Sequence, residues 1–127
     1  MSRWLRAWAP ALLWAALIWL ASDRPTVPVD LGGGRDKVAH FAAYAVLGAA
    51  LGHVRHRTGL PLPVAAGLGS LYALSDELHQ RRVPGRDAEF ADWVADALGL
   101  LAGLYGHHRW LRRRSAGRRH TPPAFHD

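Results

Sequence analysis

Four apolar segments, each about as long as a helix that crosses a bilayer, limit what this chain can fold into. They span approximately residues 4–21, 38–54, 62–78 and 92–111. A transmembrane helix needs roughly 17–25 mainly apolar residues to cross about 30 Å of hydrocarbon. Proline and glycine separate the segments, as at Pro25, Pro28 and Gly59. The pattern predicts an all-α fold, namely a polytopic transmembrane bundle of four helices.

The average composition conceals this pattern. The chain has 127 residues, enough for one domain. Its mean hydropathy of −0.07 is low for a membrane protein, because apolar segments are averaged with a very basic C-terminus. We therefore expect a membrane domain over residues 1–111 and a disordered, basic, cytoplasmic tail over residues 112–127. The tryptophans other than Trp14 mostly lie near segment ends, where an amphipathic ring meets lipid headgroups.

The net charge of +6 does not indicate binding to nucleic acid. Much of the basic excess lies in the tail, at Arg112, Arg113, Arg114, Arg118 and Arg119. No helix-turn-helix or RNA-binding signature accompanies these arginines, and a basic cluster directly after an apolar helix is typical of the anionic cytoplasmic leaflet. The absence of cysteine excludes disulfides and thiol chemistry.

The first segment and the basic residues predict how the chain lies in the membrane. The segment is longer than the apolar core of about 7–15 residues in a signal peptide, so we expect a retained helix rather than a cleaved leader. With the N-terminus inside, ten basic residues fall on the cytoplasmic side and six on the other. Because basic residues are enriched in cytoplasmic loops, we expect a multi-pass protein of the plasma membrane with both termini cytoplasmic.

This topology brings three polar segment ends to the extracytoplasmic boundary. Asp36, His40 and Tyr44 are spaced four residues apart, which places them on one face of a helix. Asp92 and Asp96 share a face of the fourth segment in the same way. Ionisable groups at membrane depth are costly and usually functional. We therefore expect a polar pocket that faces outward.

The third segment contributes the densest run of polar side chains. Tyr72, Asp76 and His79 follow one another at offsets of four and three, and Gln80 lies four residues after Asp76. Glu77 is rotated by about 100° from Asp76, so the two carboxylates need not point the same way. The second segment contains Gly48-x3-Gly52, and the fourth contains Gly99-x3-Gly103. This spacing of small residues favours close helix contact in lipid.

Simpler roles are open for several of these residues. Asp36 and Asp92 are also placed to cap helices, and His40 to be a satisfied core histidine. Asp96 is the hardest to explain in this way, because an unpaired carboxylate one turn into an apolar segment is strongly disfavoured. As a set, the residues fit metal binding, general acid–base catalysis, phosphate binding or a structural network that locks three helices together.

Several motifs in a fixed order carry a family resemblance. They are Asp36-Lys37-Val38-Ala39-His40-Phe41, Ser75-Asp76-Glu77-Leu78-His79-Gln80, Pro84-Gly85-Arg86 and Asp92-x3-Asp96-x2-Gly99. They resemble the VanZ-like family of bacterial integral membrane proteins, whose type member lowers susceptibility to teicoplanin. The resemblance implies a protein of the cell envelope and no particular reaction. An Asp at position 96, where the family usually has Asn, adds a negative charge to the site.

The main hypothesis is a pocket that binds a lipid-linked cell-wall component or a lipophilic glycopeptide antibiotic, with membrane lipids as neighbours. Candidate ligand-binding residues are Asp36, Lys37, Tyr44, Gln80, Arg86 and Asp92, of which Lys37 and Arg86 would hold a phosphate by charge-assisted contacts. The alternative is a small membrane enzyme that acts on a phosphate-bearing envelope lipid. Its candidate catalytic residues are His40, Asp76, Glu77, His79 and Asp96. A divalent metal is one option, without assigned ligands.

Overall fold

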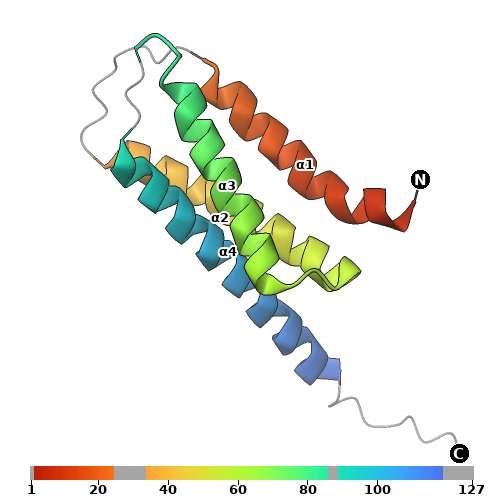
Figure 1. Ribbon diagram of the computed structural model, residues 1–127. Coiled ribbons are helices and arrows are strands. Elements are labelled where there is room, and N and C mark those ends of the chain that lie inside the picture. Colours follow the sequence, from red (N-terminus) through yellow and green to blue (C-terminus); the bar gives the residue numbers. More distant parts are fainter. Residues whose placement is uncertain (1, 25–33, 86–88, 119–127) are drawn as a thin grey trace, which may run out of the picture.

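The computed structural model describes residues 2–24, 34–85 and 89–118. Within these ranges the chain forms four α-helices and no strand (Figure 1). The helices are α1 (Arg3–Ser22), α2 (Arg35–Thr58), α3 (Leu62–Gln80) and α4 (Phe90–Gly117). The predicted all-α class and four-helix bundle are confirmed.

Local sequence explains where the helices begin and end. The Ser2 hydroxyl caps α1 by accepting a hydrogen bond of 3.3 Å from the backbone N–H of Leu5. Gly59, with a φ of 76°, ends α2 in the left-handed conformation, and its N–H donates to the Arg55 carbonyl at 2.9 Å. Pro61 then precedes α3. The turn between α2 and α3 therefore lies where the breaker residues predicted it.

Helix α4 is longer than the sequence predicted. It continues through Gly117 rather than ending at 111, because arginine is a good helix former and the Arg114 guanidinium lies 4.2 Å from the centre of the Trp110 ring. The prediction of a disordered tail is wrong for residues 112–117, whereas residues 119–127 lie outside the described part of the chain. Helix α2 likewise begins at Arg35 rather than 38.

Successive helices run in opposite directions, so their ends gather at two poles of the bundle (Figure 1). The C-terminal ends of α1 and α3 lie at the same pole as the N-terminal ends of α2 and α4. Side-chain contacts at this pole confirm the arrangement, since Lys37 of α2 reaches Asp92 of α4 and Gln80 of α3 reaches Ser22 of α1. The three polar segment ends therefore converge, as the alternating topology predicted.

Helices α2 and α4 form the closest pair in the bundle, and glycines allow their approach. A Cβ atom on Gly48 would collide with the backbone carbonyl of Leu100. A Cβ atom on Gly103 would collide in the same way with the carbonyl of Ala45, and one on Gly99 with that of Phe41. The small-residue spacing read from the sequence thus corresponds to backbone contact between the two helices.

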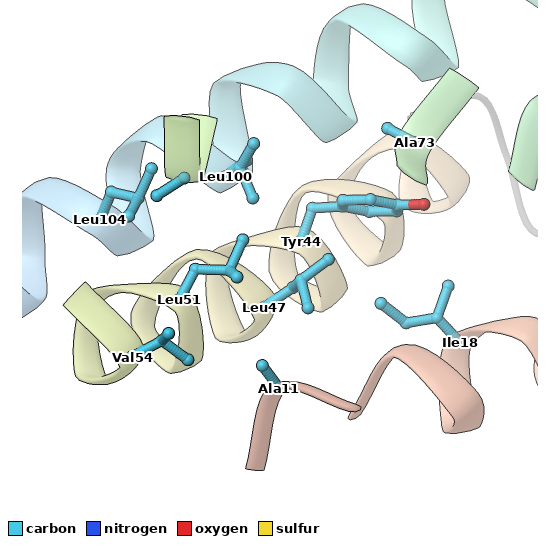
Figure 2. Packing of buried hydrophobic residues seen from close by; sticks show 10 residues of the cluster. Ala11, Ile18, Tyr44, Leu47, Leu51, Val54, Ala73, Leu100 and Leu104 are labelled. Carbon is cyan, nitrogen blue, oxygen red and sulfur yellow. The ribbon is translucent and has the colours of Figure 1, made fainter. Parts of the chain in front are cut away.

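The apolar core lies among all four helices, with Ala73 of α3 part of it (Figure 2). Tyr44, Leu47 and Leu51 project from α2 toward side chains of the neighbouring helices, with Leu100 on α4 and Ile18 on α1 among them. Side chains also bond the helices to backbone carbonyls. The Trp14 indole donates to the Ala43 carbonyl at 2.8 Å, and the Tyr72 hydroxyl donates to the Ala15 carbonyl at 2.5 Å.

The outer surface is rich in large apolar side chains, whereas several carboxylates are buried. Leu13 is 65% exposed and Leu71 is 66% exposed, while Asp76 and Asp96 are 1% and 0% exposed. Among the described residues, α1 alone is long and apolar enough throughout to qualify as a membrane span. The other three helices carry their charged residues toward their ends and inside the bundle, which lowers their average apolar character.

Candidate functional site

A cluster of buried polar side chains occupies the pole at which α1 and α3 end and α2 and α4 begin. We call it the polar cluster; its members are Ser22, His40, Tyr44, Asp76, Glu77, Gln80, Asp92 and Asp96. Apart from the partly buried His40, all are at most 5% exposed. All four helices contribute, so the cluster exists only in the assembled bundle.

His40 lies at the centre of the cluster, between two carboxylates. Its Nδ1 atom is 2.9 Å from Asp96 Oδ1 and 3.9 Å from Glu77 Oε1. Its Nε2 atom faces the exposed Asp36, with 4.0 Å to Oδ1. From the second turn of α2, His40 therefore reaches carboxylates of α3 and α4, and the imidazole joins three helices.

A second network joins α1, α2 and α3 through Asp76. Its Oδ2 atom accepts hydrogen bonds from the Tyr44 hydroxyl at 3.1 Å and from the Gln80 amide at 3.3 Å. Gln80 also donates to the Ser22 hydroxyl at 3.2 Å. Asp76 and Glu77 are both buried although they are neighbours in the sequence. Asp76 contacts Tyr44 of α2, whereas Glu77 lies near His40 and lines a cavity between α3 and α4.

Several buried carboxylate oxygens of the cluster have no hydrogen-bond partner among the described residues. They are Asp76 Oδ1, both side-chain oxygens of Glu77 and Asp96 Oδ2. An unpartnered polar atom in an apolar interior is costly, and its presence calls for an explanation such as an ion or ligand. The cluster therefore offers acceptor atoms in excess of the donors that the described residues supply.

Lys37 has two acidic partners at the edge of the cluster. Its Nζ atom donates to Glu89 at 2.9 Å and to Asp92 at 3.1 Å. Hydrogen bonds to Glu89 and then Asp92 raise the pKa of Lys37 above its usual value, so the ammonium stays charged. The pair also explains the burial of Asp92, which forms an ion pair rather than the alternative helix cap.

His79 lies apart from the His40 centre. Its Nε2 atom is 3.1 Å from Asp23 Oδ1, and its ring stacks on Trp19 with 4.1 Å between ring centres. These contacts join α3 to the end of α1. His79 and His40 therefore bind different carboxylates, although both were predicted as candidates for the same chemistry.

Three contacting residues were absent from the sequence prediction. Ser22 and Asp23 follow the first segment and Glu89 precedes the fourth, and they complete the contacts of Gln80, His79 and Lys37. Their signal was positional, since the predicted topology places the end of segment one at the same boundary. Arg86, predicted to hold a phosphate, lies outside the described residues.

A cavity of about 300 Å³ opens beside the cluster between α1, α2 and α3. Its lining combines two kinds of side chain. Apolar side chains come from α1, at Trp14, Leu17, Ile18 and Ala21, and polar ones come mainly from α2 and α3, at Asp36, His40, Tyr44, Asp76 and Gln80. The volume is at the lower end of small-molecule sites.

The geometry permits two kinds of chemistry. An imidazole held against a buried carboxylate is the arrangement of an oriented general base. The ligand atoms of His40, Glu77 and Asp96 also lie within 4.8 Å of one another, as do those of Asp36, His40 and Asp92, which is close enough to surround a cation.

Comparison with known proteins gives one match. The model of the VanZ/LLP1 family matches residues 7–111. No curated protein and no solved structure matches the chain at a significant level. The matched range includes every member of the polar cluster and most of each helix.

Proposed function

We propose that this chain, which belongs to the VanZ/LLP1 family, is a multi-pass membrane protein of the bacterial cell envelope. Its outward-facing pocket would bind an amphipathic envelope component. Proteins of this family are typically membrane-associated, and α1 has the length and apolar character of a membrane span. The resemblance to VanZ proteins supplies the link to glycopeptide antibiotics.

The observation that carries the membrane proposal is the inverted distribution of polarity. Large apolar side chains are exposed on every helix, for example Leu13 on α1, Val38 on α2, Leu71 on α3 and Leu98 on α4. Large apolar side chains exposed in such number on all four helices favour contact with lipid or with another protein. All four helices would then be embedded, including the three whose buried carboxylates reduce their average apolar character.

The two walls of the cavity indicate an amphipathic ligand. The α1 wall offers Trp14, Leu17 and Ile18 to an acyl or polyprenyl chain, whereas Asp76 and His40 face it from the other side. Carboxylate oxygens accept hydrogen bonds, so the preferred head group carries hydroxyl or amine donors. A lipid-linked saccharide of the cell wall has this chemistry, and so does a glycopeptide antibiotic with a lipid tail.

A direct phosphate contact receives less support from the described residues. Both partners of the Lys37 ammonium are carboxylates, which already occupy its charge. The predicted contribution of Arg86 stays a prediction. Recognition by donors on the head group is therefore the version of the binding hypothesis that we favour.

Binding can be tested by filling the cavity. Ala39 lines it and is exposed, so Ala39→Phe should obstruct it without disturbing the core. Ala102→Phe, on an exposed position of α4 outside the cavity, is the matched control. With a fluorescent polyprenyl-linked disaccharide in detergent, we expect Ala39→Phe to weaken binding by about tenfold or more, equivalent to about 1.4 kcal/mol. Equal binding by wild type and Ala39→Phe would contradict the proposal.

One observation favours an enzymatic alternative. His40 both lines the cavity and lies 2.9 Å from the buried Asp96, as expected of an imidazole base oriented by a carboxylate. In that case wild-type protein should convert an envelope lipid to product, and His40→Gln should abolish turnover while lipid binding persists. Absence of product with wild-type protein would remove this alternative.

A further inference from the structure

The central triad of His40, Glu77 and Asp96 contains more hydrogen-bond acceptors than donors. Within residues 2–24, 34–85 and 89–118, both side-chain oxygens of Glu77 and one of Asp96 have no hydrogen-bond partner, although the two residues are 5% and 0% exposed. A single imidazole cannot satisfy these acceptors. Side chains in this condition need a cation, a proton or a bound molecule between them.

The distances within the triad suit a metal ion. Nδ1 of His40 lies 2.9 Å from Asp96 Oδ1 and 3.9 Å from Glu77 Oε1. Bonds of about 2.0–2.2 Å to a metal separate neighbouring ligand atoms by about 3.0–3.5 Å, so small side-chain shifts would seat one. The same nitrogen faces both carboxylates.

The far side of the imidazole has the partner that a ligating histidine usually has. His40 Nε2 faces Asp36 Oδ1 at 4.0 Å. Histidines that bind a metal through one nitrogen commonly donate the other N–H to a carboxylate, which fixes the tautomer and the orientation of the ring. Asp36 is exposed and has room to close this distance.

Charge leads to the same conclusion. Asp76, Glu77 and Asp96 place three carboxylates in a buried region, where Asp92 has its own cation in Lys37. A divalent cation would offset two negative charges that the described residues leave without a basic partner. A second cavity of about 350 Å³ between α3 and α4 reaches Glu77 and offers a path for entry.

We infer that His40, Glu77 and Asp96 form a binding site for one divalent cation of intermediate hardness, such as Zn²⁺ or Mn²⁺. One imidazole with two carboxylates matches the ligand preferences of these ions. The inference goes beyond lipid binding, and each proposal can fail without the other because the ion is measured in the absence of any envelope lipid.

The test uses the full chain with a tag free of histidine, purified in mild detergent, stripped with EDTA and dialysed against Zn²⁺ or Mn²⁺. Metal content is measured by mass spectrometry. We expect about one ion per chain in wild type and at least a tenfold weaker affinity in Glu77→Gln and in Asp96→Asn. Wild-type protein that retains no ion would overturn the inference.

The His79–Asp23 pair provides matched controls. It has nearly the same separation, 3.1 Å, but no third ligand within reach among the described residues. His79→Gln and Asp23→Asn should therefore retain the ion. Loss of the ion in these controls together with retention in Glu77→Gln would place the metal elsewhere and overturn the inference.

Histidines at the opposite pole are a source of adventitious binding. His53 and His107 lie there with ring centres 6.3 Å apart. If His107→Ala loses the ion, the metal belongs to that pole and the inference is overturned. Circular dichroism shows whether Glu77→Gln and Asp96→Asn fold. If they do not, His107→Ala is the deciding variant, and an ion retained in it supports the site at His40, Glu77 and Asp96.

Discussion

Asp76 shows, at the scale of single residues, how the bundle accommodates a carboxylate. It is 1% exposed, and two donors from α2 and α3 bind the same oxygen, while Oδ1 has no partner in the part of the chain that the structure describes. Tyr44 is the only one of these donors on another helix. The stability of a buried carboxylate depends on such donors, because the interior does not replace the solvation that it loses.

Removing the Tyr44 hydroxyl should therefore destabilise the protein. Tyr44→Phe keeps the packing of the ring but deletes the bond to Asp76, and hydrogen bonds to charged groups contribute about 1.5–3 kcal/mol. We expect a loss of this size in thermal unfolding followed by circular dichroism in detergent. Tyr105→Phe, at an exposed ring on α4, should change stability little. Equal stability of Tyr44→Phe and wild type would mean that Asp76 does not depend on this donor.

Helical spacing predicted the faces of these residues but not all their partners. The four-residue spacing of Asp36, His40 and Tyr44 correctly placed them on one side of α2. Which carboxylate each would meet depends on how the helices rotate against one another, and a single sequence does not encode that rotation locally. Asp23 and Glu89 were missed for the same reason, since they lie outside the periodic segments and gain their roles only through tertiary contact.

At the scale of helices, contact between α2 and α4 dominates the bundle and depends on glycines, which have no side chain. Gly48, Gly99 and Gly103 allow the backbones of the two helices to touch. Dispersion contacts between backbone atoms therefore stabilise the pair in place of contacts between side chains. This arrangement also sets the position of Asp96, one turn before Gly99 on the same face. The helix pair thus determines the distance between His40 and its carboxylate.

Adding one methyl group at this contact should separate the helices. Gly103→Ala places its Cβ against the Ala45 carbonyl, and overpacking of this kind costs about 1–3 kcal/mol. Gly106→Ala on the same helix meets no atom within 4 Å, so it should be neutral or stabilising by up to about 1 kcal/mol through helix propensity. Thermal unfolding of both variants in the same detergent separates packing from propensity. A stable Gly103→Ala protein would contradict the close contact.

The existence and order of the helices were predictable, whereas their ends were less so. Apolar runs of the right length located all four. The predicted ends followed the last apolar residue, but charged residues continue α2 and α4, because Lys and Arg are good helix formers and helix ends need not be apolar. Hydropathy therefore located the apolar part of each helix rather than the whole helix.

The whole molecule separates its charges between two poles. One pole holds the acidic cluster, where Lys37 is paired with Glu89 and Asp92, and the other carries the histidines and arginines that end α2 and α4. At the first pole the two carboxylates offset the charge of Lys37, whereas no carboxylate among the described residues forms an ion pair with an arginine of α4. The asymmetry in effective charge is thus larger than the simple count of ten against six suggests.

This asymmetry predicts the orientation of the bundle. Arg112, Arg113 and Arg114 should hold the C-terminal pole at the cytoplasmic leaflet, where each basic residue contributes about 1 kcal/mol. A phosphatase that is active only outside the cytoplasm should therefore be active when inserted after Gly85 and inactive when fused after Gly117. A fluorescent protein that folds only in the cytoplasm should give the reverse result. Changing the three arginines to glutamate should raise the fraction of chains with phosphatase activity at Gly117, because the charge difference that fixes the orientation is then largely removed. Phosphatase activity at Gly117 in the unaltered chain would place the polar cluster on the cytoplasmic side, and the pocket would then face components made inside the cell.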